Sequence, residues 1–159
     1  MGYVSKIFVT VDVVLFKKYL NISQILLIKR KNEPFRDYWA LPGGFVDENE
    51  DLEIAAKREL REETSIDLNQ LTQIKAYGKP FRDPRSHMVT VAFWAEVGEG
   101  VIGEAADDAK ELKWFNIDDL PQLAFDHLDI ITDAVDIYKK NKSVQTYFFM
   151  LYFQEVFFP

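Results

Sequence analysis

The 159-residue sequence contains no cysteine. This absence excludes a disulfide framework, a thiol nucleophile and a zinc site with cysteine ligands. Positive charge is also scarce, because 19 lysines and arginines face 26 acidic residues and the net charge is -7. Duplex nucleic acids are bound mainly by lysines and arginines that neutralise phosphates. We therefore predict no stable nucleic-acid binding, and a small anionic substrate would need a metal ion or local arginines.

A recognisable export signal is missing as well. The N-terminus has no charged segment followed by an apolar core and a cleavage site, so we expect a cytoplasmic protein. The sequence also shows no internal repeat and no low-complexity linker. With 48% hydrophobic and 28% charged residues, its composition is typical of globular proteins, and a chain of this length can bury one substantial core. The expectation is a single domain over residues 1–159.

Two kinds of hydrophobic pattern alternate along the chain. Branched and aromatic residues predict strands at 6–16, 24–28, 39–41, 71–77, 88–96 and 112–115. Apolar residues at helical spacing predict helices at 51–64 and 126–140. The first two strands should form a hairpin with its turn at 17–21, and the nearly continuous apolar run 89–95 should be a central strand. This mixed order predicts an α/β sandwich.

The first predicted helix carries three glutamates, Glu59, Glu62 and Glu63, directly after a glycine turn. At spacings of three and four residues these carboxylates share one helical face. Like charges on one face repel each other, whereas a bound divalent cation would turn that repulsion into coordination. The alternative is a solvated acidic face, neutralised by ordinary pairs with neighbouring basic side chains, namely Lys57, Arg58 and Arg61.

The order of residues from Gly44 to Ile66 resembles the Nudix box. Gly44 is followed after five residues by Glu50 and after seven more by Arg58-Glu59-Leu60-Arg61-Glu62-Glu63-Thr64-Ser65-Ile66. The single departure is Ser65, where the family has a glycine that ends the helix, and glycine tolerates a left-handed cap better by about 1 kcal/mol. The preceding residues 39–46 also resemble the family's lead-in. The resemblance implies a Nudix-type α/β (α+β) fold, an α/β/α sandwich with a mixed central sheet.

The same resemblance implies a metal site. Glu59 and Glu63 would be direct ligands of Mg²⁺, with Mn²⁺ as a substitute, helped by a backbone carbonyl near Gly43 or Gly44. Glu62 lies beside them and is a candidate ligand of a second ion or of a metal-bound water. Such oxygen donors are the ones that magnesium prefers. Phosphoryl transfer would then proceed with charge neutralisation and an activated water.

The remaining catalytic candidates lie around this helix. Glu50 and Arg58 correspond to the family's first glutamate and arginine, and we expect them to pair and orient the metal-binding helix. An ordinary salt bridge is the alternative. The general base cannot be read from the box. A later acidic loop over 103–109 offers three residues that could reach a metal or its nucleophilic water, Glu104, Asp107 and Asp108; the alternative is an ordinary solvated loop.

Two arginines at the entrance of the predicted central strand, Arg82 and Arg85, are candidates for binding phosphate, since arginine can clamp it bidentately. The alternative is that Asp83 pairs with one of them in an Asp-Pro turn. Phe35 and Phe81 are candidates for contact with adenine. His87 stands alone and is expected to be a surface or structural residue.

Motifs outside the box narrow the resemblance to the ADP-ribose pyrophosphatase-like Nudix group. They are Asp83-Pro84-Arg85, Ala106-Asp107-Asp108-Ala109 and Ala124-Phe125-Asp126-His127. The group includes the Nudix halves of nicotinamide mononucleotide adenylyltransferases and ligand-sensing domains of repressors. No such second half fits into the remaining residues, so a stand-alone hydrolase is expected. It would split ADP-ribose into AMP and ribose 5-phosphate. The alternatives are a nucleoside triphosphate pyrophosphatase and a non-catalytic ligand-binding module.

The last residues, from about 145 to 159, are far more aromatic than the rest of the chain. They are too short and too interrupted by Gln154 and Glu155 to cross a membrane, so we predict no membrane association. An exposed aromatic tail would promote aggregation. It should dock either on the core of its own domain or on another subunit, and we favour the second arrangement, a homodimer.

Overall fold

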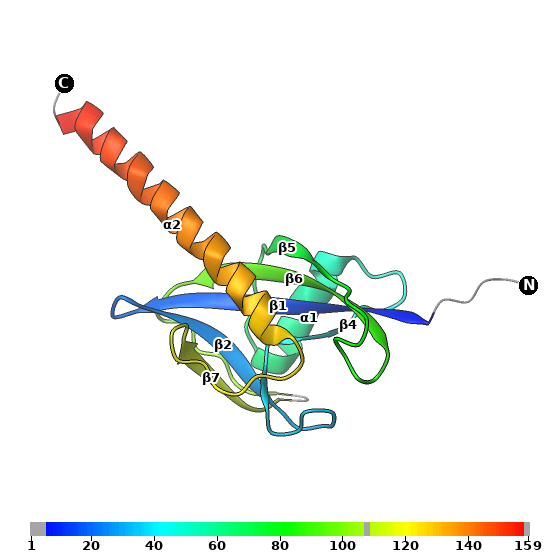
Figure 1. The fold of residues 1–159 in the computed structure, drawn as a ribbon. Coiled ribbons are helices and arrows are strands. Elements are labelled where there is room, and N and C mark those ends of the chain that lie inside the picture. Colours follow the sequence, from blue (N-terminus) through cyan, green and yellow to red (C-terminus); the bar gives the residue numbers. More distant parts are fainter. Residues whose placement is uncertain (1–5, 107–108, 158–159) are drawn as a thin grey trace, which may run out of the picture.

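The computed structural model describes residues 6–106 and 109–157, and for 145–157 it describes the helical backbone alone. A mixed sheet lies between two helices (Figure 1). The described strands follow the order β3-β2-β1-β6-β5, with β4 paired to β1 and β7 paired to β2. The sandwich with a mixed central sheet that the sequence predicts is confirmed.

The chain begins with a long hairpin of β1 (Ile7–Tyr19) and β2 (Ile22–Arg30). Tyr19 pairs with Ile22, so the loop holds two residues, Leu20 and Asn21, and both have positive φ angles. A turn of this kind matches the twist of the two strands. The loop predicted at 17–21 is therefore too long, because β1 continues in register through residues 17–19.

Strand β6 (His87–Val97) is central, as predicted. It runs parallel to β1 and is bordered on its other side by antiparallel β5 (Thr72–Tyr77). Strand β7 (Ala109–Asn116) pairs with β2, which also pairs with the short β3 (Trp39–Ala40). The sequence did not predict β4 (Gly43–Phe45), since two glycines give no strand signal.

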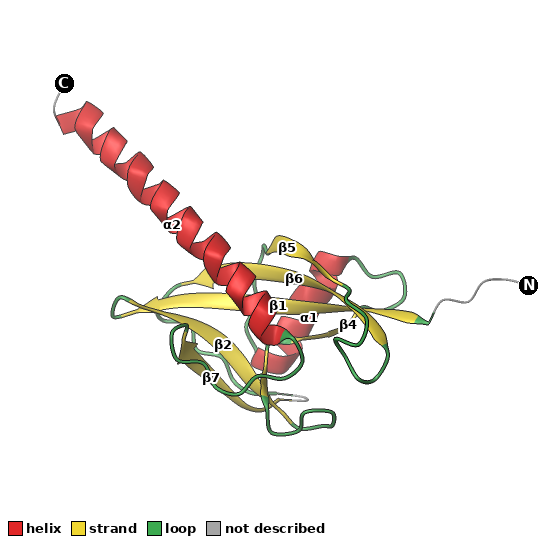
Figure 2. Cartoon of the chain, viewed as in Figure 1, coloured by secondary structure: helices red, strands yellow, loops and turns green. Residues whose placement is uncertain are grey.

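Alternating side chains of β1 divide the core between the two faces of the sheet. Val11, Val13 and Leu15 pack with the buried face of α1 (Leu52–Thr64). That face contains Ala55 and Ala56, whose small side chains let the helix approach the strands. The opposite face of β1 presents residues 14 and 16 to the first part of α2, so the two helices lie on opposite sides of the sheet (Figure 2).

Helix α2 (His127–Phe157) is much longer than the predicted segment 126–140. Its 31 residues correspond to roughly 46 Å at 1.5 Å per residue. The first part packs on the sheet through Ile130, Ile131, Ala134 and Tyr138, and the Tyr138 ring stacks on Phe16 with centroids 4.3 Å apart. Figure 1 shows the remainder of the helix projecting away from the sheet. Within the described chain, neither helix combines the length and apolar character that crossing a bilayer requires.

Candidate functional site

A turn containing Gly43 and Gly44 brings the backbone close to helix α1. Gly43 has a φ of +155°, a region that favours glycine. Its N–H donates to the Glu63 carboxylate at 2.9 Å. A Cβ atom on Gly43 would lie 2.9 Å from the Cα of Asp12, and one on Gly44 would lie 2.5 Å from the Glu59 carboxylate. Glycine at position 43 therefore lets the turn lie directly against the backbone of β1, and glycine at position 44 leaves room for the Glu59 carboxylate.

The two ends of α1 are fixed by local hydrogen bonds. At the N-terminus, the Asp51 side chain accepts from the N–H groups of Glu53 and Ile54, a typical N-cap. At the C-terminus, Ser65 adopts the left-handed conformation with a φ of 58°, where the family's glycine is expected. The Ile66 N–H donates to the Thr64 hydroxyl at 3.2 Å. The helix therefore ends in the expected place without glycine.

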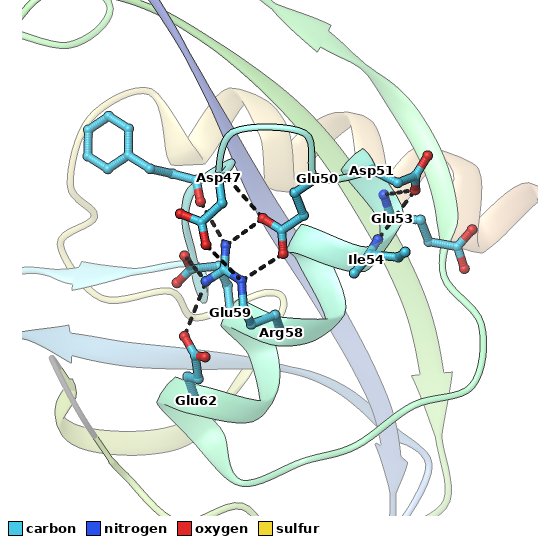
Figure 3. A network of polar contacts seen from close by, with 9 residues as sticks. Asp47, Glu50, Asp51, Glu53, Ile54, Arg58, Glu59 and Glu62 are labelled. Atoms are coloured by element: carbon cyan, nitrogen blue, oxygen red, sulfur yellow. Dashed lines mark hydrogen bonds and ion pairs between the residues drawn. The ribbon is translucent and has the colours of Figure 1, made fainter.

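One guanidinium, that of Arg58, connects the acidic side chains around the helix (Figure 3). It donates two hydrogen bonds of 2.8 Å to Glu50, one of 2.8 Å to Glu59 and one of 3.2 Å to Glu62. It also donates to the Phe45 carbonyl at 2.9 Å. The hydrogen bonds from Arg58, helped by the Asp47 N–H, lower the pKa of Glu50 to about 2. The structure thus brings together the predicted orienting pair and links it directly to Glu59.

Glu59 and Glu63 are the helix carboxylates that line a cavity of ≈ 310 Å³, together with the glycine turn and Asp47. Burial raises the pKa of Glu59, the Arg58 hydrogen bond opposes this rise, and the charge of Glu62 adds to it. Glu63 is 7% exposed. Glu62 has 41% of its side chain exposed and is oriented toward Arg58. The predicted ligands Glu59 and Glu63 therefore share a cavity, whereas Glu62 is not among the residues that line it.

The donor set of this cavity fits a hard cation. Glu59, Glu63 and Asp47 offer only carboxylate oxygens, and magnesium is commonly held by one or two carboxylates while it retains several waters. In the part of the chain that the structure describes, no three acidic or imidazole side chains form a ready metal cage. The residues thus fit an ion held by a carboxylate pair, with backbone or water completing its shell.

The two candidate arginines are both held by carboxylates. Arg85 lines the cavity, pairs bidentately with Asp83 through Nε and Nη2, and lies over the rings of Phe45 and Phe125. Arg82 pairs bidentately with Asp126, with distances of 2.8 and 2.5 Å. Its side chain is 5% exposed and lines a smaller adjoining cavity. The pairing of Asp83 with an arginine is thus present, and the phosphate role of Arg85 stays a prediction.

The two candidate phenylalanines have different surroundings. Phe35 packs against Tyr38 and Phe125, with ring centroids 5.6 and 4.8 Å apart. Phe81 is 96% exposed and borders a separate hollow, so it does not line the cavity that holds Glu59 and Glu63. His87 also lines that hollow, and its Nε2 lies 3.2 Å from the Gly78 carbonyl.

The acidic loop approaches the end of α1. The Glu104 N–H donates to the Thr64 carbonyl at 2.9 Å, and the Ala106 N–H donates to the Glu63 carbonyl at 3.1 Å. The side chain of Glu104 is exposed. Asp107 and Asp108 lie outside the described residues, so the candidate base in this loop stays a prediction.

Sequence reasoning missed Arg30, Phe125 and His127 as residues of the site. Arg30 lines both cavities and lies over the Phe125 ring at 4.9 Å. Phe125 and His127 also line the smaller cavity. In the sequence, the motif Ala124–His127 indicates only a resemblance. Its proximity to the glycine turn depends on the fold, so no local pattern could have revealed it.

Comparisons with known proteins agree with this geometry. A family model described as NUDIX domain matches residues 6–134. An ADP-ribose pyrophosphatase of Methanocaldococcus jannaschii is 47% identical over 111 residues, which are 70% of this chain and 65% of that protein. An ADPR responsive transcriptional repressor of Acinetobacter baylyi is 38% identical over 79% of this chain and 52% of the repressor. The chain thus matches between half and two thirds of the length of these relatives.

A solved structure gives a close geometric match. It is the NUDIX domain of NrtR from Shewanella oneidensis, complexed with ADP ribose. The TM-score is 0.78 at 32% sequence identity, and the match covers 85% of this chain and 90% of that domain. The similarity therefore extends from the sequence motif to the arrangement of the whole sandwich.

Proposed function

The chain belongs to the Nudix family, and from this premise we propose that it hydrolyses a nucleoside diphosphate linked to another group. The leading substrate is ADP-ribose, which would give AMP and ribose 5-phosphate. The observation that carries the proposal is the placement of Glu59 and Glu63 in one cavity beside the glycine turn. The similarity to an ADP-ribose pyrophosphatase and to a domain complexed with ADP ribose supports the choice of substrate.

The residues of the chain have separate tasks in this proposal. Mg²⁺, or Mn²⁺ in its place, would neutralise diphosphate charge and lower the pKa of a water. Glu59 and Glu63 would hold the ion, and the Arg58–Glu50 pair fixes the orientation of Glu59. Arg85 presents its guanidinium to the cavity between two aromatic rings, where it can contact a substrate phosphate. The walls of the cavity, formed in part by the turn and the helix, would orient the diphosphate.

The substrate proposal predicts a specific product pattern. With Mg²⁺ the protein should convert ADP-ribose to equal amounts of AMP and ribose 5-phosphate. Its kcat/KM for ADP-ribose should exceed that for any nucleoside triphosphate by at least about tenfold, the discrimination that a few pocket contacts supply. Ion-exchange chromatography of the products, with dinucleotides and nucleotide sugars as competing substrates, measures both quantities.

Two other results would redirect the proposal. Release of pyrophosphate from a nucleoside triphosphate at higher efficiency would favour nucleotide sanitation. Tight binding of ADP-ribose without turnover in saturating Mg²⁺ would favour a ligand-binding module, the role suggested by the repressor relative.

We also propose that the partner is a small nucleotide and not duplex DNA. The net charge of -7 works against phosphate-backbone binding. The repressor similarity covers 52% of that relative, so the function of its other half does not come with the match. A cytoplasmic location belongs to the same proposal.

The C-terminal helix supports a proposed homodimer. Helix α2 projects beyond the sheet (Figure 1), and residues 145–157 are rich in aromatic side chains. Each such side chain contributes about 1.5–3 kcal/mol when it is buried, and a symmetric pair would bury two copies with one set of contacts. We therefore expect a dimer at micromolar concentration in sedimentation velocity. Deleting residues from Tyr147 onward should give monomers or aggregates.

A full-length variant can show whether the dimer depends on the aromatic side chains or on the length of the helix. Replacing Phe148, Phe149 and Phe153 with alanine places the strongest helix former at all three positions, yet it should also weaken the dimer. A monomeric intact chain at micromolar concentration would contradict the proposal.

A further inference from the structure

A buried hydrogen bond connects the glycine turn to the start of α2. The Leu41 N–H donates to His127 Nδ1 at 2.9 Å across 86 residues of sequence. Leu41 is 2% exposed and His127 is 4% exposed. Beside this bond, the Ala124 N–H donates to the Trp39 carbonyl at 2.8 Å. The segment before α2 therefore holds the chain that leads into the glycine turn.

This hydrogen bond determines the tautomer of the His127 imidazole ring. A backbone N–H can only donate, so Nδ1 must offer a lone pair, and the proton of the neutral ring lies on Nε2. Burial lowers the pKa of His127, which favours this neutral form. Nε2 faces Asp12 at 3.6 Å, and the other Asp12 oxygen accepts from the Thr90 hydroxyl at 2.6 Å. The ring is directed at protein groups on both sides, which argues against a role as a base toward substrate.

The residues after Leu41 are held from other directions. The Pro42 carbonyl accepts from the Val13 N–H on β1 at 2.9 Å. The Gly43 N–H donates to Glu63 on α1 at 2.9 Å. Three successive residues of the turn are thus attached to α2, to the sheet and to the candidate metal-binding helix. Loss of the acceptor at His127 would leave a buried N–H without a partner, which favours movement of the turn.

We propose that His127 is a positioning residue for the ion site. Its Nδ1 acceptor holds Leu41, and Leu41 in turn holds Gly43 in the place where it contacts Glu63. The ion part of this inference rests on the proposed function, whereas the hydrogen bond does not. The side chain itself needs no contact with ion or substrate.

Two substitutions test the acceptor. Asparagine has an oxygen the same number of bonds from Cα as Nδ1, whereas glutamine places its amide one carbon farther out. His127→Asn should bind Mn²⁺ within about threefold of wild type. His127→Gln should bind it about ten to a hundred times more weakly, the usual cost of losing a residue that orients a ligand. Titration of the full chain with Mn²⁺ alone, followed by electron paramagnetic resonance, measures this without turnover.

Kinetics and hydrogen exchange provide independent readouts. In His127→Gln, kcat should fall at saturating Mg²⁺ while KM for ADP-ribose changes little, because the defect lies at the ion and not at the substrate contacts. Exchange of the Leu41 amide should quicken in this variant and stay slow in His127→Asn. Equal Mn²⁺ affinity in both variants and wild type would overturn the inference.

The wild-type protein keeps the inference testable if a variant does not fold. A scalar coupling between the nitrogens of Leu41 and His127 Nδ1 should appear in NMR spectra of the labelled full chain. Saturating Mg²⁺ should slow exchange of the Leu41 amide several-fold, since the ion and the hydrogen bond stabilise one turn conformation. Absence of the coupling, or unchanged exchange with Mg²⁺ bound, would overturn the inference. Wild type that binds Mn²⁺ but does not hydrolyse ADP-ribose would refute the proposed function alone.

Discussion

Glu59→Gln should lower the turnover of ADP-ribose by at least about a hundredfold, the usual scale for losing a group that stabilises transition-state charge. The change removes a negatively charged candidate metal ligand from the cavity that Glu59 shares with Glu63. Glutamine keeps the shape and can still accept from Arg58, so the loss isolates the charge. Steady-state kinetics with saturating Mg²⁺ and a purified, folded variant would measure it.

Glu53→Gln provides the matched control. Glu53 lies on the same helix, pairs with Lys57 and accepts from the Leu71 N–H, all away from the cavity. Its kcat should stay within about twofold of wild type, since exposed pairs of this kind contribute little. Wild-type turnover in Glu59→Gln at saturating Mg²⁺ would show that the metal assignment is wrong.

The two adjacent glycines should respond to alanine in different ways. In Gly44→Ala the new methyl group would lie 2.5 Å from the Glu59 carboxylate, the far end of a flexible side chain. That carboxylate can swing aside, so kcat should fall about tenfold to a hundredfold, as expected when a catalytic group is displaced by about 1 Å. The free energy of unfolding should change by less than about 1 kcal/mol.

In Gly43→Ala the new methyl group would clash with the backbone of β1. The new Cβ would lie 2.9 Å from the Cα of Asp12, and the φ of +155° is unfavourable for alanine. The free energy of unfolding should fall by about 2–4 kcal/mol, combining strain with the displacement of β4 from β1. Urea denaturation compares both variants directly. Similar stability losses in the two, or full activity in Gly44→Ala, would contradict this account of the turn.

The helix and its acidic face were predictable because their signals are local. Glu59 and Glu63 are one turn apart, so any helix over 51–64 places them together, and the Gly44 to Ile66 pattern indicates the turn before it. The hairpin and the central strand were equally readable from apolar periodicity. Strand β4 was not, because its only signal is its pairing with β1.

Residues contributed by distant segments were the least predictable. Arg82 and Arg85 were singled out, but the pairing of Arg82 with Asp126 depends on a contact across 44 residues. The Asp83 pairing with Arg85, left open as an alternative, is present in the structure. The contribution of His127 also comes from the fold, since its partner is a backbone N–H that has no sequence signature.

Strand β1 holds the glycine turn of the site in register. Val11 pairs with Gly44 and Asp12 with Gly43, while Thr10 lines the cavity and Asp12 accepts from Thr90 on the other neighbouring strand. Side chains alternate along a strand, so a slip of one residue would exchange its two faces. Such a slip would turn Val11 and Val13 out of the α1 core and carry Asp12 away from the turn at once. A misregistered chain would therefore lose the packing of the core and the geometry of the site in one step.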